Sequence, residues 1–327
     1  MGTPLLDVQN LTVVYGRTDG VYAVRDVNLT LHHGEFLGLV GESGCGKSTL
    51  AYAIARLIKP PAHIAQGTVT FREHNLLGLH GEALRHERWE HLAVVLQSGM
   101  NALNPLMTIE RQFFDVMSQH TRWPMSKQRE RVYELLEMVH VERRFASCYP
   151  HQLSGGMKQR VAIALSMILE PELIIMDEPT TALDVVVQRT ILDNLMEIRK
   201  AREFAVIFVS HDLGLVLEIA DRVAVMYAGE IVEAQPAEQL YAQPLHPYTR
   251  ALLKSVADPD DIRERRFSGL PGHPPDLHLD SIGPGCPFYP RCTEHEDRCR
   301  NEKPTLSPMG PESVVSCWIR RKEPVDA

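Results

Sequence analysis

The stretch GESGCGKSTL, residues 41–50, constrains the fold of this chain more than any other part of its sequence. It follows the continuous apolar run EFLGLV, which is typical of a strand buried on both faces, and it leads into KSTLAYAIARLI, which has helical spacing. A glycine-rich loop in that position turns successive backbone N–H groups toward phosphate oxygens at a helix N-terminus. The sequence therefore predicts an α/β protein that binds a nucleotide through a phosphate loop.

The loop matches the pattern G-x-x-x-x-G-K-[ST], in which the lysine reaches the β and γ phosphates and the next hydroxyl ligates Mg²⁺. Lys47 and Ser48 hold those two positions. The alternative is a glycine turn with a chance Lys-Ser pair, but the predicted strand before the loop and helix after it are the context that the motif requires. The candidate phosphate-loop residues are Gly41, Ser43, Gly44, Cys45, Gly46, Lys47, Ser48 and Thr49.

Two carboxylates, Asp177 and Glu178, close the apolar strand pattern LIIMDEP. A carboxylate at the end of a buried strand beside a phosphate loop can hold Mg²⁺ through water, and a second one can polarise the attacking water. We assign the first role to Asp177 and the second, catalytic role to Glu178. The alternative is a solvated acidic strand end, and only the combination with the phosphate loop favours catalysis.

The segment LSGGMKQR supplies a serine hydroxyl and two glycine N–H groups at the start of a helix, which makes a second anion-binding device. One chain has little use for two such devices around one ATP. We therefore expect two subunits to pack head to tail, each closing over the nucleotide of the other. The alternative is an ordinary helix N-cap formed by Ser154. The candidate residues are Leu153, Ser154, Gly155 and Gly156.

The rest of the chain has the pattern of a parallel sheet with additions. Residues 5–31 alternate apolar and polar residues, which predicts antiparallel strands, and residues 67–97 contain short strand-like pieces. Residues 108–169 are mostly helical in pattern, and ELIIMDEP and FAVIFVSHD then alternate with helical segments in a βαβ rhythm. After residue 257 the composition shifts to Pro, Gly, His and charge, which favours a linker or a loosely structured appendage.

Over residues 5–257 the chain resembles the ATP-binding subunit of an ABC transporter. The motifs of that family occur here in its order: the phosphate loop, LSGGMKQR, IIMDEPTTALD and VSHD. The resemblance implies an ABC-type nucleotide-binding domain at residues 1–257. That domain would have a P-loop core, an antiparallel β subdomain and a helical subdomain inserted at about 98–168. Residues 258–327 would form a small cysteine-rich C-terminal extension.

The resemblance also assigns roles to single residues. Tyr15 matches the aromatic residue that stacks on adenine, with Tyr22 as a rival. Gln97 matches the glutamine that senses Mg²⁺ and contacts the membrane subunits. His211 matches the catalytic histidine that grips the γ-phosphate, and Asp184 matches the aspartate that crosses the dimer interface.

The resemblance implies an ATPase that uses ATP and Mg²⁺, with the metal held by Ser48 and Gln97. The expected partners are two transmembrane permease subunits, a second related ATPase or another copy of this chain, and indirectly an extracytoplasmic substrate-binding protein. No apolar run approaches the ~18 residues that span a membrane, and the N-terminus carries no targeting signal. We therefore expect a peripheral protein on the cytoplasmic face of the cell (inner) membrane.

The segments NALNPLMTI and QPLHPYTRALLKSV resemble the branch that imports dipeptides, oligopeptides and nickel. The variant SGMNALNP after Gln97 has counterparts among oligosaccharide carriers, so oligosaccharides and nickel stay as alternatives to peptides. A rival of another class is a soluble ABC ATPase that acts on DNA or ribosomes. Acidic side chains outnumber basic ones, 42 against 34, and the net charge of −8 argues against a nucleic-acid partner.

Four cysteines near the C-terminus need a separate explanation. They read Cys286-x5-Cys292-x6-Cys299-x17-Cys317, which in a reducing cytosol favours a metal over disulfides. Zinc usually has a tighter C-x2-4-C pair, whereas four thiolates also suit a four-iron four-sulfur (4Fe-4S) cluster. Resemblance to the CPFYPRC region of the branch favours the cluster, with zinc and unligated thiols as alternatives. We expect it to fold a tail too polar to form its own core, and His295 to be exposed rather than a ligand.

Overall fold

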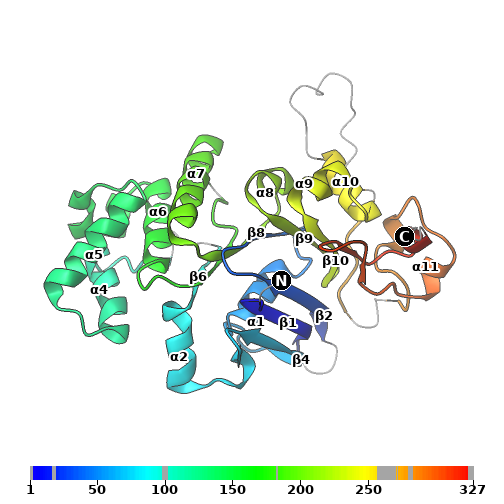
Figure 1. Ribbon diagram of the computed structural model, residues 1–327, viewed down its shortest axis with the longest axis horizontal. Helices are drawn as coiled ribbons and strands as arrows, with labels where there is room; N and C mark the ends of the chain where they lie inside the picture. The colour runs from blue at the N-terminus through cyan, green and yellow to red at the C-terminus, as the bar shows by residue number, and fades with distance from the viewer. Residues whose placement is uncertain are drawn as a thin grey trace. The chain divides into compact units, whose positions relative to one another are not determined.

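The computed structural model describes residues 3–16, 20–97, 102–181, 183–255, 270, 272–278 and 283–322 (Figure 1). The chain divides into two compact units. The first consists of residues 1–31, 36–77 and 210–327, and the second consists of residues 32–35 and 78–209. The expected domain boundary at residues 257/258 and the expected start of a helical subdomain near residue 98 lie outside the described residues.

The first unit contains an antiparallel sheet with the strand order β2-β1-β4-β5. Its strands are β1 (Leu6–Tyr15), β2 (Val21–Leu31), β4 (Ala62–Phe71) and β5 (His74–Asn75). In β2 the buried residues Val27, Leu29 and Leu31 alternate with polar residues, as expected of a strand with one face on the core. The antiparallel strands predicted within residues 5–31 are confirmed, and Leu6 lies opposite Leu31.

A second sheet of the first unit carries the phosphate loop. The strands are β3 (Phe36–Val40), β9 (Arg222–Tyr227), β10 (Glu230–Pro236), β11 (Ser307–Pro308) and β12 (Val314–Val315). β3 is parallel to β9, β9 is antiparallel to β10, and β12 is antiparallel to both β10 and β11. The C-terminal tail therefore pairs with the sheet. This pairing was not predicted, because strands of two residues are too short to show a periodic pattern in the sequence. The helices of this unit are α1 (Lys47–Ile54), α8 (Leu213–Ile219), α9 (Ala237–Ala242), α10 (Pro247–Ser255) and α11 (Arg298–Asn301).

The second unit is built on parallel strands, with Leu92 opposite Leu173 and Leu173 opposite Ala205. The strands are β6 (Leu92–Val95), β7 (Leu173–Asp177) and β8 (Ala205–Ser210). The helices are α2 (Gly81–Glu90), α4 (Ile109–His120), α5 (Met125–Met138), α6 (Gly155–Ser166) and α7 (Val185–Arg202). α4, α5 and α6 lie side by side and confirm the helical pattern predicted for residues 108–169 (Figure 1). α2 was not predicted, because none of its residues is buried and it has no apolar periodicity.

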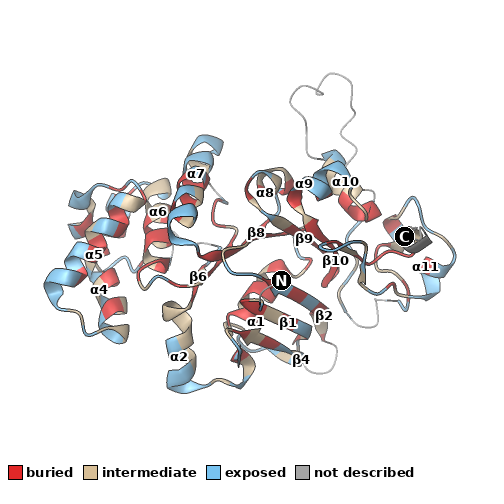
Figure 2. Ribbon diagram, viewed as in Figure 1, coloured by how far each residue is buried: buried red, intermediate tan, exposed pale blue. Residues whose placement is uncertain are grey.

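The apolar runs that were predicted as buried strands are buried along their whole length in β3, β7 and β8. Figure 2 shows this burial for β8. The phosphate loop follows β3, the pair Asp177–Glu178 lies at the end of β7, and His211 follows β8. Each candidate group is thus held at the carboxyl end of a rigid strand. Among the helices in the described part of the chain, none combines the length and the hydropathy needed to cross a bilayer.

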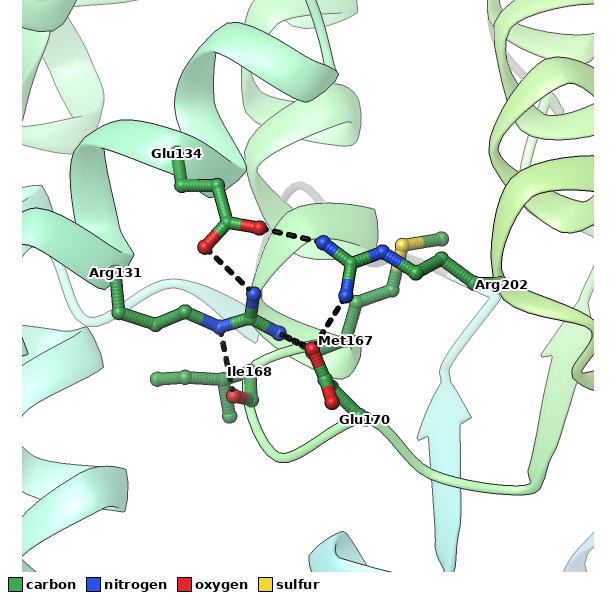
Figure 3. Close-up of polar contacts among 6 residues, drawn as sticks. All are labelled: Arg131, Glu134, Met167, Ile168, Glu170 and Arg202. Atoms are coloured by element: carbon green, nitrogen blue, oxygen red, sulfur yellow. Dashed lines mark hydrogen bonds and ion pairs between the residues drawn. The ribbon is translucent and has the colours of Figure 1, made fainter.

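A polar network in the second unit ties the end of α6 to α5 and α7 (Figure 3). Arg131 of α5 is buried, and its guanidinium donates to the main-chain carbonyls of residues 167 and 168 at 3.1 and 3.2 Å. Those carbonyls lie just after α6, where no further turn of helix supplies N–H groups to bind them. Glu134 and Glu170 each pair with Arg131 and with Arg202 of α7. The network therefore fixes the helix that begins with the LSGG segment.

We expect Arg131→Ala to lower the free energy of unfolding by about 2 kcal/mol. The substitution removes the donors to two helix-end carbonyls and leaves two carboxylates without one of their cationic partners. The matched control is Arg144→Ala, which removes an exposed ion pair with Glu142 and should cost less than about 0.5 kcal/mol. Urea unfolding of both variants measures the difference, and equal losses would contradict a special role for Arg131.

Candidate functional site

The phosphate loop runs from the end of β3 to the start of α1 and depends on glycines at two points of close packing. Gly41 and Gly46 have φ of 152° and 108°. A Cβ added at Gly41 would lie 2.1 Å from the carbonyl oxygen of Met226 in β9, and one added at Gly46 would lie 2.0 Å from that of Ala23 in β2. The backbone of the loop is therefore pressed against two neighbouring strands, which leaves no room for a side chain at either point.

Lys47 closes the loop on itself. Its side chain is buried, with 5% of its surface exposed, and its Nζ donates to the carbonyl oxygens of Gly41 at 2.8 Å and Glu42 at 2.9 Å. The ammonium group thus sits inside the ring of backbone that the sequence predicted for phosphate. Ser43 and Gly44 at the tip of the loop are exposed, so an anion can approach the loop from solvent.

The other predicted residues of the loop have separate environments. Burial raises the pKa of the Cys45 thiol, against the opposing effect of Lys47, so this cysteine packs as a neutral group. Ser48 and Thr49 lie in the first turn of α1 and are partly exposed. The oxygen of Thr49 lies 3.2 Å from the hydroxyl of Tyr15, the last residue of β1.

Tyr15 is thereby placed at the edge of the phosphate loop, with 37% of its surface exposed. Its rival Tyr22 pairs with Val14 in the neighbouring strand and is also partly exposed. Stacking of adenine on Tyr15 stays a prediction. His211 is exposed and immediately precedes Asp212, whose carboxylate caps the N-terminus of α8 by accepting from Leu215 N. The cap holds the turn that carries the histidine.

In the second unit the structure brings Gln97 and Glu178 together. The carboxylate of Glu178 accepts a hydrogen bond from the Gln97 amide at 3.0 Å and another from the Thr181 hydroxyl at 3.1 Å. Glu178 has φ of 44°, and its N–H donates to Val209 O in β8 at 3.0 Å. Asp177, one residue earlier, is fully buried. The left-handed turn after β7 therefore separates a buried carboxylate from one that is aimed outward and oriented by two donors.

The LSGG segment starts α6 as predicted. Ser154 caps the helix by accepting a hydrogen bond from Met157 N at 3.3 Å, so the ordinary N-cap is present whether or not the segment also binds an anion. A Cβ added at Gly156 would lie 2.6 Å from a methyl group of Val187 in α7, which explains the glycine at that position. Leu153 is buried and anchors the turn before the helix.

Asp184 caps α7 in the same way, since its carboxylate accepts from Val187 N at 2.9 Å. The two residues that follow it, Val185 and Val186, are 80% and 75% exposed. They place two adjacent apolar side chains on the surface beside Asp184. The dimer-crossing role of Asp184 stays a prediction.

The four C-terminal cysteines surround a small cavity that is also lined by His246 and Phe288. Burial raises the pKa of three of these thiols, of Cys286 to about 12. Within the described residues, however, no three histidine, cysteine, aspartate or glutamate side chains converge closely enough to hold a metal ion. The four thiols thus line one cavity, but their arrangement gives no support to the predicted metal centre. His295 is exposed, as expected.

Two contacts to the phosphate loop were missed in the sequence. The N–H of Glu42 donates to the hydroxyl of Tyr248 in α10 at 2.8 Å, and the carboxylate of Glu42 pairs with Arg291 of the cysteine-bearing tail. Arg291 lies in the segment CPFYPRC, but nothing in its spacing points to a loop about 250 residues earlier.

Comparison with known proteins gives two family matches. Residues 24–181 match the ABC transporter family, and residues 232–299 match the C-terminal region of oligopeptide/dipeptide transporters. The first match contains the phosphate loop and the Asp177–Glu178 pair, and the second contains part of the tail.

The curated relatives match over nearly the whole chain. The chain is 42% identical to the probable peptide ABC transporter ATP-binding protein y4tR of Sinorhizobium fredii, covering 96% of this chain and 94% of the relative. It is 40% identical to the dipeptide transport ATP-binding protein DppD of Bacillus subtilis (97% and 95%). It is 39% identical to the oligopeptide transport ATP-binding protein OppD of Haemophilus influenzae (97% and 97%).

Among solved structures, the chain is similar to the ATP-binding cassette MJ0796 in a dimeric post-hydrolysis state bound to ADP and Pi. The TM-score is 0.64 at 31% identity, and the match covers 71% of this chain and 98% of the other. The cassette cbiO1 of Clostridium perfringens gives a TM-score of 0.65 at 27% identity, covering 74% and 92%. The expected α/β nucleotide-binding fold is confirmed, and each match leaves more than a quarter of the chain uncovered.

We expect Gly46→Ala to weaken ATP binding by more than about tenfold, because the new Cβ must displace the loop from the Ala23 carbonyl at a φ that favours glycine. Gly44→Ala is the matched control, since its φ of 80° is also positive but no heavy atom lies within 4 Å of the added Cβ. Equilibrium titration with a fluorescent ATP analogue measures both variants, with thermal unfolding as the check on folding. Equal affinities of the two variants would contradict the packing argument.

Proposed function

This chain belongs to the ABC transporter family as an ATP-binding subunit, and we propose that it hydrolyses ATP to drive the uptake of dipeptides and oligopeptides through separate membrane permeases. The match of residues 232–299 to the oligopeptide/dipeptide transporter C-terminal region carries the peptide part of the proposal. The phosphate loop and the LSGG segment serve phosphate chemistry that is independent of cargo. The relatives named above carry peptide, dipeptide and oligopeptide in their names, which favours peptides over oligosaccharides or nickel.

Nucleotide binding is assigned to the phosphate loop and Tyr15. The backbone N–H groups of the phosphate loop and the ammonium of Lys47 bind the β and γ phosphates, and the ring of Tyr15 stacks on adenine. Ser48 and Gln97 would hold Mg²⁺, with Asp177 joined through water, and the metal would neutralise charge on the phosphate oxygens. Mg²⁺ prefers oxygen ligands, and these side chains supply a hydroxyl, an amide oxygen and a carboxylate.

Hydrolysis is assigned to Glu178 and His211. Glu178 polarises the attacking water, and the hydrogen bonds from Gln97 and Thr181 support this role because they orient its carboxylate. His211 grips the γ-phosphate. Because Gln97 donates to Glu178, a movement of the segment around Gln97 would reorient the carboxylate. That link provides a route by which contact with a permease regulates hydrolysis.

A second ATPase subunit, either a related chain or another copy, completes the proposed machine. Its LSGG segment would close over the nucleotide of this chain, and residues 153–156 of this chain would do the same in return. Asp184 would cross the interface, and the exposed Val185 and Val186 beside it support burial of this surface in a dimer. Closure of the pair on ATP moves two permease subunits, and hydrolysis reopens it. We place the complex on the cytoplasmic face of the inner membrane, receiving cargo from an extracytoplasmic binding protein.

We also propose that Cys286, Cys292, Cys299 and Cys317 hold a 4Fe-4S cluster, with Zn²⁺ as the alternative. Four thiols around one cavity are a donor set that suits either group. The group would stabilise a tail whose own apolar core is small. Loss of protons from thiols with raised pKa values would accompany binding.

The peptide proposal is tested by purifying the tagged chain from native membranes, identifying its partners and assaying ATPase activity of the complex in lipid. We expect two permease subunits and an ATPase rate that rises when a binding protein loaded with short peptides is added. Stimulation by oligosaccharide-loaded or nickel-loaded binding proteins alone would reassign the cargo. Recovery only with ribosomes or DNA would reject the transporter role.

Glu178→Gln should abolish steady-state ATP hydrolysis while ATP binding stays within about twofold of the unaltered protein. Glutamine keeps the shape and a hydrogen-bonding oxygen but cannot act as a base. Lys47→Ala is the contrasting variant, because it should weaken binding itself. Retained turnover by Glu178→Gln would overturn the catalytic assignment.

The cysteine proposal predicts iron and acid-labile sulfide in protein purified without oxygen, with broad visible absorption that is lost in Cys286→Ser. Zinc without iron would select the alternative. Absence of both metals from anaerobic protein would leave four structural thiols and reject the proposal.

A further inference from the structure

Arg291 of the cysteine-bearing tail contacts the phosphate loop directly. Its two terminal nitrogens donate to the two carboxylate oxygens of Glu42 at 2.6 and 2.9 Å, which is a bidentate ion pair. The side chain of Arg291 is 5% exposed and that of Glu42 is 22% exposed, so solvent screens the pair weakly. The contact joins residues of one compact unit.

The arginine is held in place by aromatic side chains. Its guanidinium lies 5.8 Å from the centre of the Tyr227 ring and 3.4 Å from the hydroxyl of that residue. Tyr227, Tyr248 and Phe288 pack together with ring centres 4.6 to 5.5 Å apart. Tyr227 comes from the β9 strand, Tyr248 from α10 and Phe288 from the tail. The tail is therefore anchored on the sheet at the point where Arg291 reaches the loop.

Glu42 is fixed through three groups: its carboxylate, its N–H and its carbonyl. Its carboxylate binds Arg291, its N–H donates to Tyr248 Oη at 2.8 Å, and its carbonyl accepts from Lys47 Nζ at 2.9 Å. The last contact connects the tail to the lysine that binds phosphate. A loop whose backbone is already ordered loses less conformational freedom when ATP binds.

We propose that Arg291 is a positioning residue for ATP, which preorganises the phosphate loop by clamping Glu42 from the C-terminal tail. The inference rests on ATP being bound by the phosphate loop. It gives the tail a role in nucleotide affinity.

The test measures the affinity of the full-length chain for ATP by calorimetric titration. Magnesium is present throughout, under conditions in which ATP is hydrolysed slowly. Arg291→Ala should raise the Kd about tenfold, and Arg291→Lys should recover part of the loss because lysine makes a single rather than a bidentate contact. The matched control is Glu294→Ala, which removes the ion pair between Glu294 and Arg250 of α10 but touches no residue of the loop. Its Kd should stay within about twofold.

Glu42→Ala cuts the same contact from the loop side and leaves the tail intact, so it tests the proposal even if Arg291→Ala folds poorly. We expect Glu42→Ala, Arg291→Ala and the double variant to share about the same Kd, because all three lose one and the same clamp. In steady-state assays KM should rise with kcat nearly unchanged, whereas a purely structural role would lower the melting temperature without changing KM.

Unchanged Kd values in both single variants, or losses that multiply in the double variant, would overturn the proposal. If Lys47→Ala also binds ATP normally, the assignment of the phosphate loop itself fails, and that outcome is distinguishable from failure of the clamp.

Discussion

The close packing of the phosphate loop against two strands is the constraint on which the rest of the structure depends. Gly41 and Gly46 bring the loop backbone within contact of the carbonyls of Met226 and Ala23, and Lys47 closes the loop from inside. The loop can keep this shape only while β2 and β9 stay in place. The antiparallel sheet, the β9–β10 hairpin and the tail that pairs with β10 therefore all bear on nucleotide affinity, although none of them is phosphate-binding itself.

In the second unit, helix caps and the left-handed turn at Glu178 hold the candidate residues in place. Asp177 and Glu178 are adjacent in sequence, yet the turn at Glu178 leaves the first buried and the second accepting hydrogen bonds from Gln97 and Thr181. Ser154 and Asp184 each accept a hydrogen bond from one of the free N–H groups at the start of a helix, α6 and α7 respectively. The Arg131 network closes the other end of α6, so that helix is held at both ends.

The tail is more than an appendage to the ATP-binding fold. It adds β12 to the edge of the β10 strand, gathers four thiols around a cavity and sends Arg291 to Glu42. Arg291 directly precedes Cys292, so order in the thiol segment and order in the phosphate loop are mechanically linked. The bidentate contact is geometrically demanding, which makes the link sensitive to small displacements of the tail.

Sequence patterns alone predict the α/β class, the buried strands and the helical stretch between residues 108 and 169, because these follow from local periodicity and from the glycine pattern of the phosphate loop. The sequence also identified the carboxylates and the LSGG helix start, which are contiguous signals, and the thiols, which cluster near the C-terminus. It missed α2, which has no apolar face. The metal centre that it predicted at the four thiols stays a proposal. Tertiary packing brings Gln97 to Glu178 and Arg291 to Glu42, pairs that are 81 and 249 residues apart in the sequence. Contacts at such separations depend on how whole elements pack, and no local pattern of residue types encodes them.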